Sequence, residues 1–315
     1  YCPIHGNGIG VLVADSPFGP FKDPIGKPLV WRQEHWSDID PAIWIDDDGQ
    51  AYMYWGNPHT YCVRLNEDMI STKGEIMQMD PIGDYQEGPW FWSRKNARGE
   101  KWYYLAYAST CCPEGIGYAM SKSPTGPWEH KGHIMDHTPR TRGNHPGIID
   151  FKGKSYCFGL TYDIFRLESS RHAERRCCMA AEMTYNADGT IQELPYFQDC
   201  KLEQVGTFTP FRRAEAEPMA WGYGLKTTRE NPSGPWNPTL FVTDIDDGEY
   251  ILVKGVDFGN GAKELLVSCS AQMFGGTMEI RLDAPDGWKA GSIDVPNTKF
   301  KYETFRTALT KCSGV

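Results

Sequence analysis

The sequence lacks any long apolar run, since no stretch of about 18 consecutive apolar residues occurs, and this excludes a helix able to cross a membrane. It also lacks a basic excess: 32 Lys and Arg stand against 41 Asp and Glu, for a net charge of −9. Domains that bind nucleic acids carry a basic surface instead. We therefore expect neither a membrane nor a nucleic acid among the partners of this chain.

Metal and nucleotide signatures are also missing. None of the ten cysteines forms a Cys-x-x-Cys pair, which argues against a zinc ribbon. The adjacent pairs Cys111-Cys112 and Cys177-Cys178 are unsuited to bridging internally, so we expect mostly buried free thiols on strands and few disulfides. The glycine pairs of Gly8-Ile-Gly10 and Gly115-Ile-Gly117 precede no helical pattern, which excludes a dinucleotide-binding loop.

One histidine series has metal-like spacing, His130-x2-His133-x3-His137. It follows the bend Gly126-Pro-Trp128, so we expect it on an outer loop. Structural zinc sites draw their ligands from Cys and His together, and no cysteine or helical segment lies beside this series. We therefore predict no metal site there.

Short strands and turn signals take the place of long helical patterns, which predicts an all-β protein. A strand, a glycine turn and an aromatic strand recur around Gly49, Gly99 and Gly153, at intervals of 50 and 54 residues. The bend Ser16-Pro-Phe-Gly-Pro returns as Ser123-Pro-Thr-Gly-Pro after 107 residues, which is two such periods. A sheet repeated about every 50 residues is typical of β-propeller blades, and a β-sandwich with coincidental turns is the alternative.

The repeat stops near Ile191, and residues 241–283 instead read as closely spaced strands separated by Asp-Gly and Gly-Asn turns. This pattern is typical of a β-sandwich. We place the domain boundary near residue 208, which gives domains 1–208 and 209–315.

Two carboxylates occupy equivalent positions in successive blades. Asp40 lies in Ser37-Asp-Ile-Asp-Pro41 before one inner strand, and Glu87 lies 47 residues later before the next. Inner strands of a propeller converge on its axis, so we expect the two side chains to point to one place. Glycoside hydrolysis needs two carboxyl groups, although a solvated loop carboxylate is the more ordinary alternative for each. The denser cluster Asp46 to Asp48 belongs to a hairpin turn.

These segments resemble glycoside hydrolase family 43 over residues 1 to about 208. Ile39–Gly56 resembles the second-carboxylate motif of that family, and Glu87-Gly-Pro-Trp90 resembles its general-acid motif. Asn144-His-Pro-Gly147 is similar to the segment that places a histidine beneath the active site. Arg175-Arg176, with the strand that follows, resembles a late arginine-containing strand.

The resemblance implies a five-bladed β-propeller with inverting activity on arabinose- and xylose-containing polysaccharides. It implies that Glu87 is the general acid and that Asp40 raises the pKa of this acid and orients it. It implies that His145 lies on the axis, near substrate and a metal ion or water cluster, and that Arg176 contacts substrate.

The resemblance also implies a general base, an Asp in the first blade. Residues 1–35 and three further repeats account for about three and a half blades, counted from the repeat. We therefore expect the first part of the propeller, with the base, to precede Tyr1. Aromatic rings that could stack on sugars are Trp36, Trp55, Trp90 and Trp92, with burial in the blade core as the alternative for each.

Residues 209–315 resemble a family 6 carbohydrate-binding module, a β-sandwich of the jelly-roll type, without its usual last strand. The resemblance implies binding of xylan-like glycans, and a structural calcium with Glu217 among its ligands. For the ring that stacks on sugar we assign Tyr302, with Phe300 and Phe305 as alternatives.

We therefore expect an inverting glycosidase, of arabinofuranosidase or β-xylosidase type, that acts on plant cell-wall arabinoxylan or xylan. No cofactor is expected beyond the structural calcium, and we expect a secreted monomer. A non-catalytic glycan-binding protein is the alternative, and a structural interaction propeller would leave Asp40 and Glu87 without a role.

Overall fold

The computed structural model describes the chain except for residues 5, 33–36, 112, 142, 164–175, 201, 219–220 and 231–238. The described residues form two compact units, one reaching Leu202 and the other beginning at Glu203. The boundary that we placed near residue 208 stays a prediction. Within the described residues, no helix combines the length and apolar character that crossing a membrane requires.

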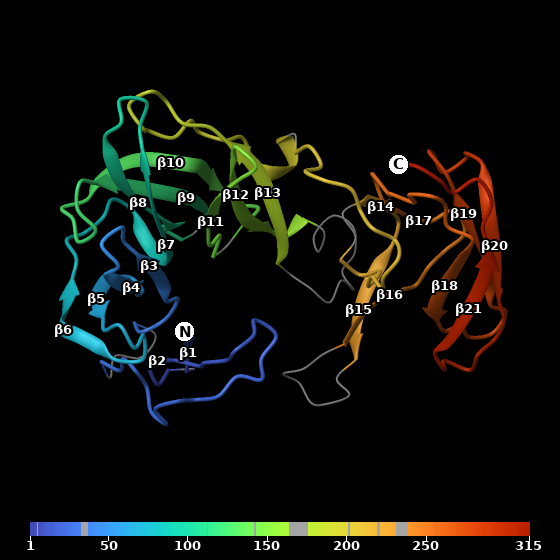
Figure 1. The fold of residues 1–315 in the computed structure, drawn as a ribbon, viewed down its shortest axis with the longest axis horizontal. Helices are drawn as coiled ribbons and strands as arrows, with labels where there is room; N and C mark the ends of the chain where they lie inside the picture. Colours follow the sequence, from blue (N-terminus) through green and yellow to red (C-terminus); the bar gives the residue numbers. More distant parts are fainter. Residues whose placement is uncertain are drawn as a thin grey trace. The chain divides into compact units, whose positions relative to one another are not determined.

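The first unit consists of antiparallel sheets that follow one another along the chain (Figure 1). A short leading pair comprises β1 (Cys2–Pro3) and β2 (Ile9–Gly10). The first full sheet, in spatial order, is β3 (Ala42–Ile45), β4 (Ala51–Trp55), β5 (Tyr61–Leu65) and β6 (Thr72–Gln78). The second is β7 (Tyr85–Lys95), β8 (Lys101–Ser109), β9 (Glu114–Ser121) and β10 (Glu129–Thr138). The third is β11 (Gly147–Phe151), β12 (Lys154–Thr161) and β13 (Cys177–Met183), and a 3₁₀ turn, η2 (Phe197–Asp199), comes later.

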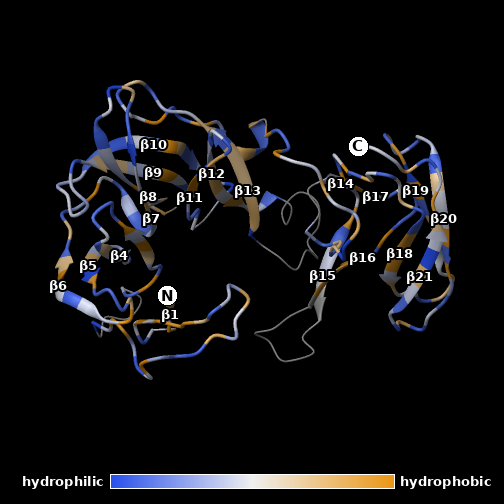
Figure 2. Cartoon of the chain, viewed as in Figure 1, coloured by the Kyte–Doolittle hydropathy of each residue, from blue (hydrophilic) through white to orange (hydrophobic). Residues whose placement is uncertain are grey.

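Each sheet is one propeller blade, and its chain order is its spatial order, as in a meander. The blades begin where the sequence repeat predicts them. The middle strands β4 and β9 are buried along their whole length, because a blade has neighbours on both faces. In Figure 2 a strand such as β13 is coloured toward the hydrophobic end of the scale, whereas many loop residues are coloured as hydrophilic.

The hydrophobic core lies between successive blades rather than within one of them. One cluster joins β4 and β5 of the first blade to β7 and β8 of the second, where Tyr54 stacks on Phe91 with ring centroids 4.3 Å apart. A second cluster joins β8 and β9 to β11 and β12, with Tyr104, Ile116 and Ile148 among its members. Burial of these large side chains stabilises the stack of blades, at roughly 25 cal/mol for each Å² of apolar surface removed from water.

The predicted turns are confirmed in position and conformation. Gly49, Gly99 and Gly153 close the first hairpin of each blade with φ values of +83°, +78° and +80°, a region that L-residues rarely adopt. The two Ser-Pro-x-Gly-Pro segments form the same bend, in which Gly19 and Gly126 donate their N–H groups to the carbonyls of Ser16 and Ser123. The inner strands β3, β7 and β11 each lie at one edge of their sheet.

The second unit is built from strands that pair in a nested order. β14 (Trp221–Tyr223) pairs with β17 (Tyr250–Leu252) and encloses β15 (Lys226–Glu230) paired with β16 (Thr239–Thr243). In the same way, β18 (Glu264–Cys269) pairs with β21 (Glu303–Ala308) and encloses β19 (Gly276–Arg281) paired with β20 (Lys289–Val295). Pairing of strands distant in sequence is typical of Greek-key sandwiches, as the sequence predicts.

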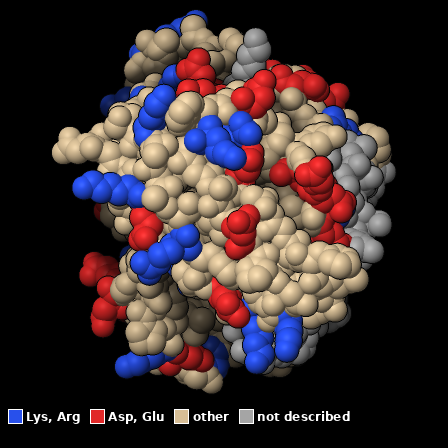
Figure 3. All heavy atoms as spheres, turned by 90° about the vertical axis from the view of Figure 1, so that its right-hand side faces the viewer, with Lys and Arg blue, Asp and Glu red and all other residues tan. Residues whose placement is uncertain are grey.

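Charged side chains of both signs are interspersed among uncharged ones on the face drawn in Figure 3. A single-sign basic patch, of the kind that binds nucleic acids, does not occur on that face.

The cysteines follow the predicted pattern in part. Cys62 on β5 and Cys157 on β12 are free and buried, and burial raises the pKa of each thiol to about 12, which keeps both unreactive. Cys111 takes part in a disulfide, although we regarded its adjacent pair as unsuited to bridging internally.

Candidate active site

Three residues converge from the starts of three inner strands. Asp40 lies two residues before β3, Glu87 is the third residue of β7, and His145 lies two residues before β11. His145 Nε2 is 3.3 Å from Glu87 Oε1 and 3.9 Å from Asp40 Oδ2. Equivalent positions in successive blades thus meet in space, which brings together three of the side chains that the sequence singled out.

Asp40 is held in an unusual environment. Its backbone has a φ of +55°, which is uncommon for a residue other than glycine, and its Oδ2 atom is buried without a hydrogen bond. Burial raises the pKa of this carboxyl, and the charge of Glu87 adds to the rise. A buried carboxyl without a partner on one oxygen is a good acceptor for a proton, which makes Asp40 suited to holding one.

Glu87 has the opposite character. Its Oε1 atom is bonded to His145, and its Oε2 atom accepts a 2.6 Å hydrogen bond from Asn57 Nδ2. The hydrogen bond from His145 lowers the pKa of Glu87, and the contact with Asn57 adds to this effect against the opposing effect of burial. Two donors thus stabilise the ionised form of Glu87, and the role of Asp40 in raising the pKa of this acid stays a prediction.

His145 faces both carboxylates. Burial disfavours its imidazolium form, but the hydrogen bond to Glu87 and the charge of Asp40 outweigh burial and raise its pKa. Gly88 allows this contact, because a Cβ atom there would lie only 2.6 Å from the His145 ring. The φ of +62° at Gly88 also favours glycine. The histidine is thus placed to carry a proton between the two carboxylates.

Arg176 lies at the edge of the same group. Its Nε atom donates to the hydroxyl of Tyr162 over 3.2 Å, and its positive charge helps to lower the pKa of both Asp40 and Glu87. Gly143 lies between the guanidinium and Glu87, where a Cβ would be 3.1 Å from Arg176 and 3.5 Å from Glu87. The predicted late arginine therefore does reach the carboxylates.

Asn57 is the site residue that sequence reasoning missed. Besides bonding Glu87, its Oδ1 atom accepts a hydrogen bond from Gln86 Nε2 over 2.9 Å. It follows β4 in the segment Trp55-Gly-Asn-Pro58, directly after the motif Ile39–Gly56. The sequence signal that could have identified Asn57 is a polar residue directly after β4, because β4 ends beside the start of β3.

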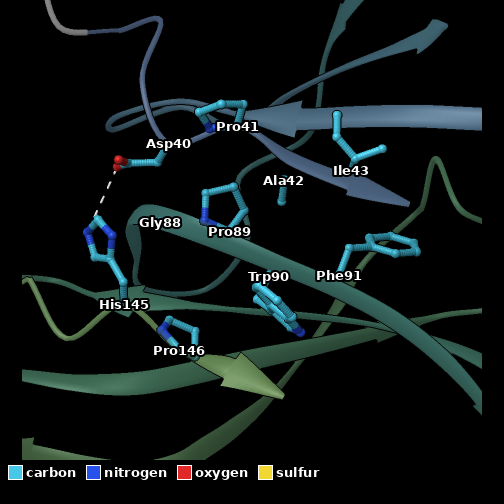
Figure 4. Close-up of a pocket in the computed structure, with 10 residues that line it drawn as sticks. All are labelled: Asp40, Pro41, Ala42, Ile43, Gly88, Pro89, Trp90, Phe91, His145 and Pro146. Carbon is cyan, nitrogen blue, oxygen red and sulfur yellow. Dashed lines mark ion pairs between the residues drawn. The ribbon is translucent and has the colours of Figure 1, made fainter. Parts of the chain in front are cut away.

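A pocket of about 400 Å³ extends from Asp40 and His145 along the inner strands β3 and β7 (Figure 4). Trp90 forms part of its wall and is 39% exposed, with its indole N–H donating to the carbonyl of Ile148 over 3.0 Å. Glu87 is not among the residues lining this pocket. Of the three candidate tryptophans within the described residues, Trp90 is the one that lines the pocket.

Trp55 and Trp92 lie in the blade core. Trp55 is completely buried and donates its indole N–H to Asp38 over 2.9 Å, so its assignment to substrate was wrong. Trp92 is also buried, stacked on Tyr104 with ring centroids 4.9 Å apart. Both belong to the blade core because both faces of these strands are covered. Trp36 lies outside the described residues.

In the second unit, Tyr302 is 54% exposed and makes an edge contact with Phe241, with ring centroids 6.4 Å apart. Phe300 is exposed as well, whereas Phe305 is half-buried on β21. Glu217 is partly exposed, and neither cluster of metal-ligand atoms found among the described residues includes it. Its assignment to a calcium site therefore stays a prediction.

The separation of the carboxylates limits what the cluster can do. Ligand atoms of Asp40, Glu87 and His145 all lie within 4.8 Å of one another. An inverting glycosidase holds its acid and base roughly 6.5–9.5 Å apart, to leave room for a water molecule. Asp40 and Glu87 are too close to be that couple, so the group fits a proton donor with an auxiliary carboxylate. Two oxygens and one imidazole could also hold a cation.

Comparisons with known proteins agree with this geometry. Residues 2–191 match the family model of glycosyl hydrolases family 43, and residues 215–315 match that of the carbohydrate binding module of family 6. The chain is 32% identical to an arabinoxylan arabinofuranohydrolase of Bacillus subtilis (strain 168) and 31% identical to one of Paenibacillus polymyxa. Both alignments cover the whole of this chain. It spans 66% of the first relative and 54% of the second.

A solved structure is similar over almost the whole chain. It is the crystal structure of a family 43 arabinoxylan arabinofuranohydrolase from Bacillus subtilis in complex with cellotetraose. It matches 98% of this chain and 69% of its own, with a TM-score of 0.73 and 29% identity.

Proposed function

Since the chain belongs to glycosyl hydrolases family 43 and carries a family 6 carbohydrate binding module, we propose that its protein is an inverting glycosidase that acts on arabinoxylan. Both curated relatives that align along the whole chain are arabinoxylan arabinofuranohydrolases, which favours release of arabinofuranosyl groups over xylosyl groups. The observation that carries the proposal is the convergence of Asp40, Glu87 and His145 at the starts of three inner strands.

In the proposed mechanism, Glu87 protonates the oxygen of the leaving sugar as the glycosidic bond breaks. Glu87 is ionised while His145 and Asn57 bond it, so it must first gain a proton. A sugar that displaces water from the site disfavours the ionised carboxylate, and His145 is the adjacent proton donor. Asp40, with its raised pKa, faces the same imidazole and positions it.

A third carboxylate must activate the water, because Asp40 lies too close to Glu87 for this task. Attack by water from the opposite face of the sugar would release the product with inverted anomeric configuration.

The second unit is proposed to hold the enzyme on its polymer. The match to a carbohydrate binding module and the exposed rings of Tyr302 and Phe300 support this role, because aromatic faces stack on sugars. Calcium at Glu217, calcium beside His145, a monomeric state and secretion belong to the same proposal. Secretion is supported by the nature of the substrate, which is a cell-wall polymer.

The test is product analysis by proton NMR during hydrolysis of arabinoxylan by the full-length protein, with Glu87→Gln as the blank. Early release of the inverted anomer of arabinose, absent with Glu87→Gln, would support the proposal. Release of xylose instead would change the substrate assignment, and the retained anomer would contradict the mechanism. Binding to arabinoxylan without release of sugar would favour the glycan-binding alternative.

A further inference from the structure

A second cluster of titratable side chains lies outside the candidate active site, in the second blade. It consists of Asp84, which directly precedes β7, and of His133 and His137 on β10. Asp84 Oδ2 is 2.8 Å from His133 Nε2 and 3.4 Å from His137 Nε2. Within the described part of the chain, this group and the one around His145 are the two in which three such atoms gather.

The histidines gather because β10 is an irregular strand rather than the outer loop that the sequence suggested. In its pairing with β9, register shifts occur between His130 and Gly132 and between His133 and Met135. Bulges of this kind change the face to which a strand points its side chains. The rings of His130 and His133 consequently lie 5.8 Å apart, and those of His133 and His137 lie 4.6 Å apart.

Further side chains orient the group. The Tyr107 hydroxyl donates to Asp84 Oδ1 over 3.3 Å and lies 2.7 Å from Nδ1 of His130. This leaves Asp84 Oδ2 facing the two imidazoles. Gly117 makes room for the arrangement, because a Cβ there would be 2.4 Å from the Tyr107 ring and 3.0 Å from Asp84 Oδ1.

His137 has the partner that metal-binding histidines commonly have. Its Nδ1 atom lies 3.2 Å from Asp136 Oδ1, and such a carboxylate fixes the ring and its tautomer. Its Nε2 atom is 3.1 Å from Ser109 Oγ as well as facing Asp84. One ligand atom from each of Asp84, His133 and His137 thus lies within 4.8 Å of the other two.

The two imidazole nitrogens and one carboxylate oxygen of this cluster determine which metal ion it can bind. Imidazole nitrogens favour zinc and similar first-row cations, whereas calcium and magnesium favour oxygen ligands. Zinc bonds of about 2.0–2.1 Å place tetrahedral ligand atoms about 3.3 Å apart. The separations of 2.8 Å and 3.4 Å in the cluster are close to this value. The three side chains are 22–30% exposed, so water can complete the coordination.

We propose that Asp84, His133 and His137 bind one Zn²⁺ ion. The ion would join β10, at one edge of the blade, to the segment that leads into β7 at the other edge. Asp84 is separated from Glu87 by two residues, so the ion would anchor the start of the strand that carries the candidate general acid. The site does not depend on the proposed glycosidase activity.

The test uses the full-length protein freed of metals by a chelator, with Co²⁺ as the absorbing probe and Zn²⁺ as its competitor. We expect one Co²⁺ per chain with the strong visible bands of a four-coordinate site, displaced by Zn²⁺, and a Zn²⁺-dependent rise in Tm. Asp84→Asn, His133→Gln and His137→Gln should each weaken Co²⁺ binding by at least about tenfold. Asp136→Asn should weaken it by roughly tenfold, since it removes only the partner of a ligand.

Two histidine variants separate this site from other binding. His59→Gln changes an exposed histidine outside the cluster and should bind Co²⁺ like the wild type. His145→Gln removes a ligand from the cluster at the candidate active site and should keep the tetrahedral bands. Circular dichroism checks the fold of every variant. The proposal is overturned if folded wild type shows no such bands, or if folded His137→Gln and Asp136→Asn bind Co²⁺ as tightly as the wild type.

Discussion

Protonation of Glu87 depends on His145, because the imidazole donates to Oε1 and its charge also favours the ionised carboxylate. Replacing the histidine by glutamine removes that charge, so the pKa of Glu87 should rise. Carbon-13 NMR titration of labelled glutamate side chains measures this directly, with Glu87→Gln to assign the signal. His59→Gln is the matched control and should leave the titration unchanged. An unchanged or lower pKa in His145→Gln would show that another group controls Glu87.

Gly88 combines two constraints that can be separated by experiment. Alanine there would have to adopt a φ of +62° and place its Cβ 2.6 Å from the His145 ring. Gly49 has a φ of +83°, but a Cβ there would meet nothing within 4 Å.

We therefore expect Gly49→Ala to cost about 1 kcal/mol, from backbone strain alone, and Gly88→Ala to cost about 2–3 kcal/mol, from strain plus displacement of the ring. Urea denaturation measures both values. Equal losses would mean that the His145 contact adds no constraint.

Sequence reasoning located Asp40 and Glu87 because each has an equivalent place in a repeat, and equivalent places converge on one axis. His145 was located by the resemblance of Asn144-His-Pro-Gly147 to a family 43 segment. It could not foresee the protonation pattern, which depends on contacts such as Asn57 to Glu87, between residues 30 positions apart. It assigned Trp55 wrongly because a middle strand of a blade is buried on both faces, so alternation along the strand carries no information about exposure.

At the scale of elements, Lys101 on β8 forms ion pairs with the first hairpin of the preceding blade. Lys101 Nζ is 2.5 Å from Asp46 Oδ1 and 2.7 Å from Asp47 Oδ2, and the Tyr103 hydroxyl donates to Asp46 Oδ2 over 2.6 Å. Burial alone would raise the pKa of Asp46, but the hydrogen bonds from Lys101 and Tyr103 outweigh it, and the pKa is lowered.

A lowered folded-state pKa stabilises the protein above the unfolded value, about 3.9 for Asp, and this contribution is lost as pH falls through the folded value. Asp46→Asn should therefore destabilise the protein by about 1 kcal/mol at pH 7. The difference from wild type should shrink below about pH 4. Urea denaturation across this pH range measures it, with Asp48→Asn, an exposed change in the same turn, as the control. A deficit that persists undiminished at low pH would exclude the ion pair as its cause.

The elements themselves were predictable where local chemistry determines them. Glycine turns at Gly49, Gly99 and Gly153 mark the first hairpin of each blade, and β3–β4, β7–β8 and β11–β12 pair around them. The histidine series was predicted on an outer loop but lies on β10. The bulges of β10 arise from the pairing of β10 with β9, which no local sequence pattern reveals.

At the scale of the whole molecule, three blades together form a cluster that no single blade could form. Asp40, Glu87 and His145 come from three blades, and their mutual distances of less than 5 Å fit a proton donor with its supporting groups rather than an acid and base couple. The blade repeat predicted the convergence of Asp40 and Glu87, and the resemblance to family 43 added His145. The two domain types were predictable from the change in pattern after Ile191.

The most direct test compares leaving groups in the full-length protein. A general acid is needed for a sugar leaving group, but hardly for dinitrophenolate, which departs without a proton. Glu87→Gln should therefore lower kcat/KM on arabinoxylan by about 10²–10⁴-fold and change it far less on a dinitrophenyl arabinofuranoside. Equal losses on both substrates would contradict the assignment of Glu87 as the general acid, and with it the proposed role of the cluster.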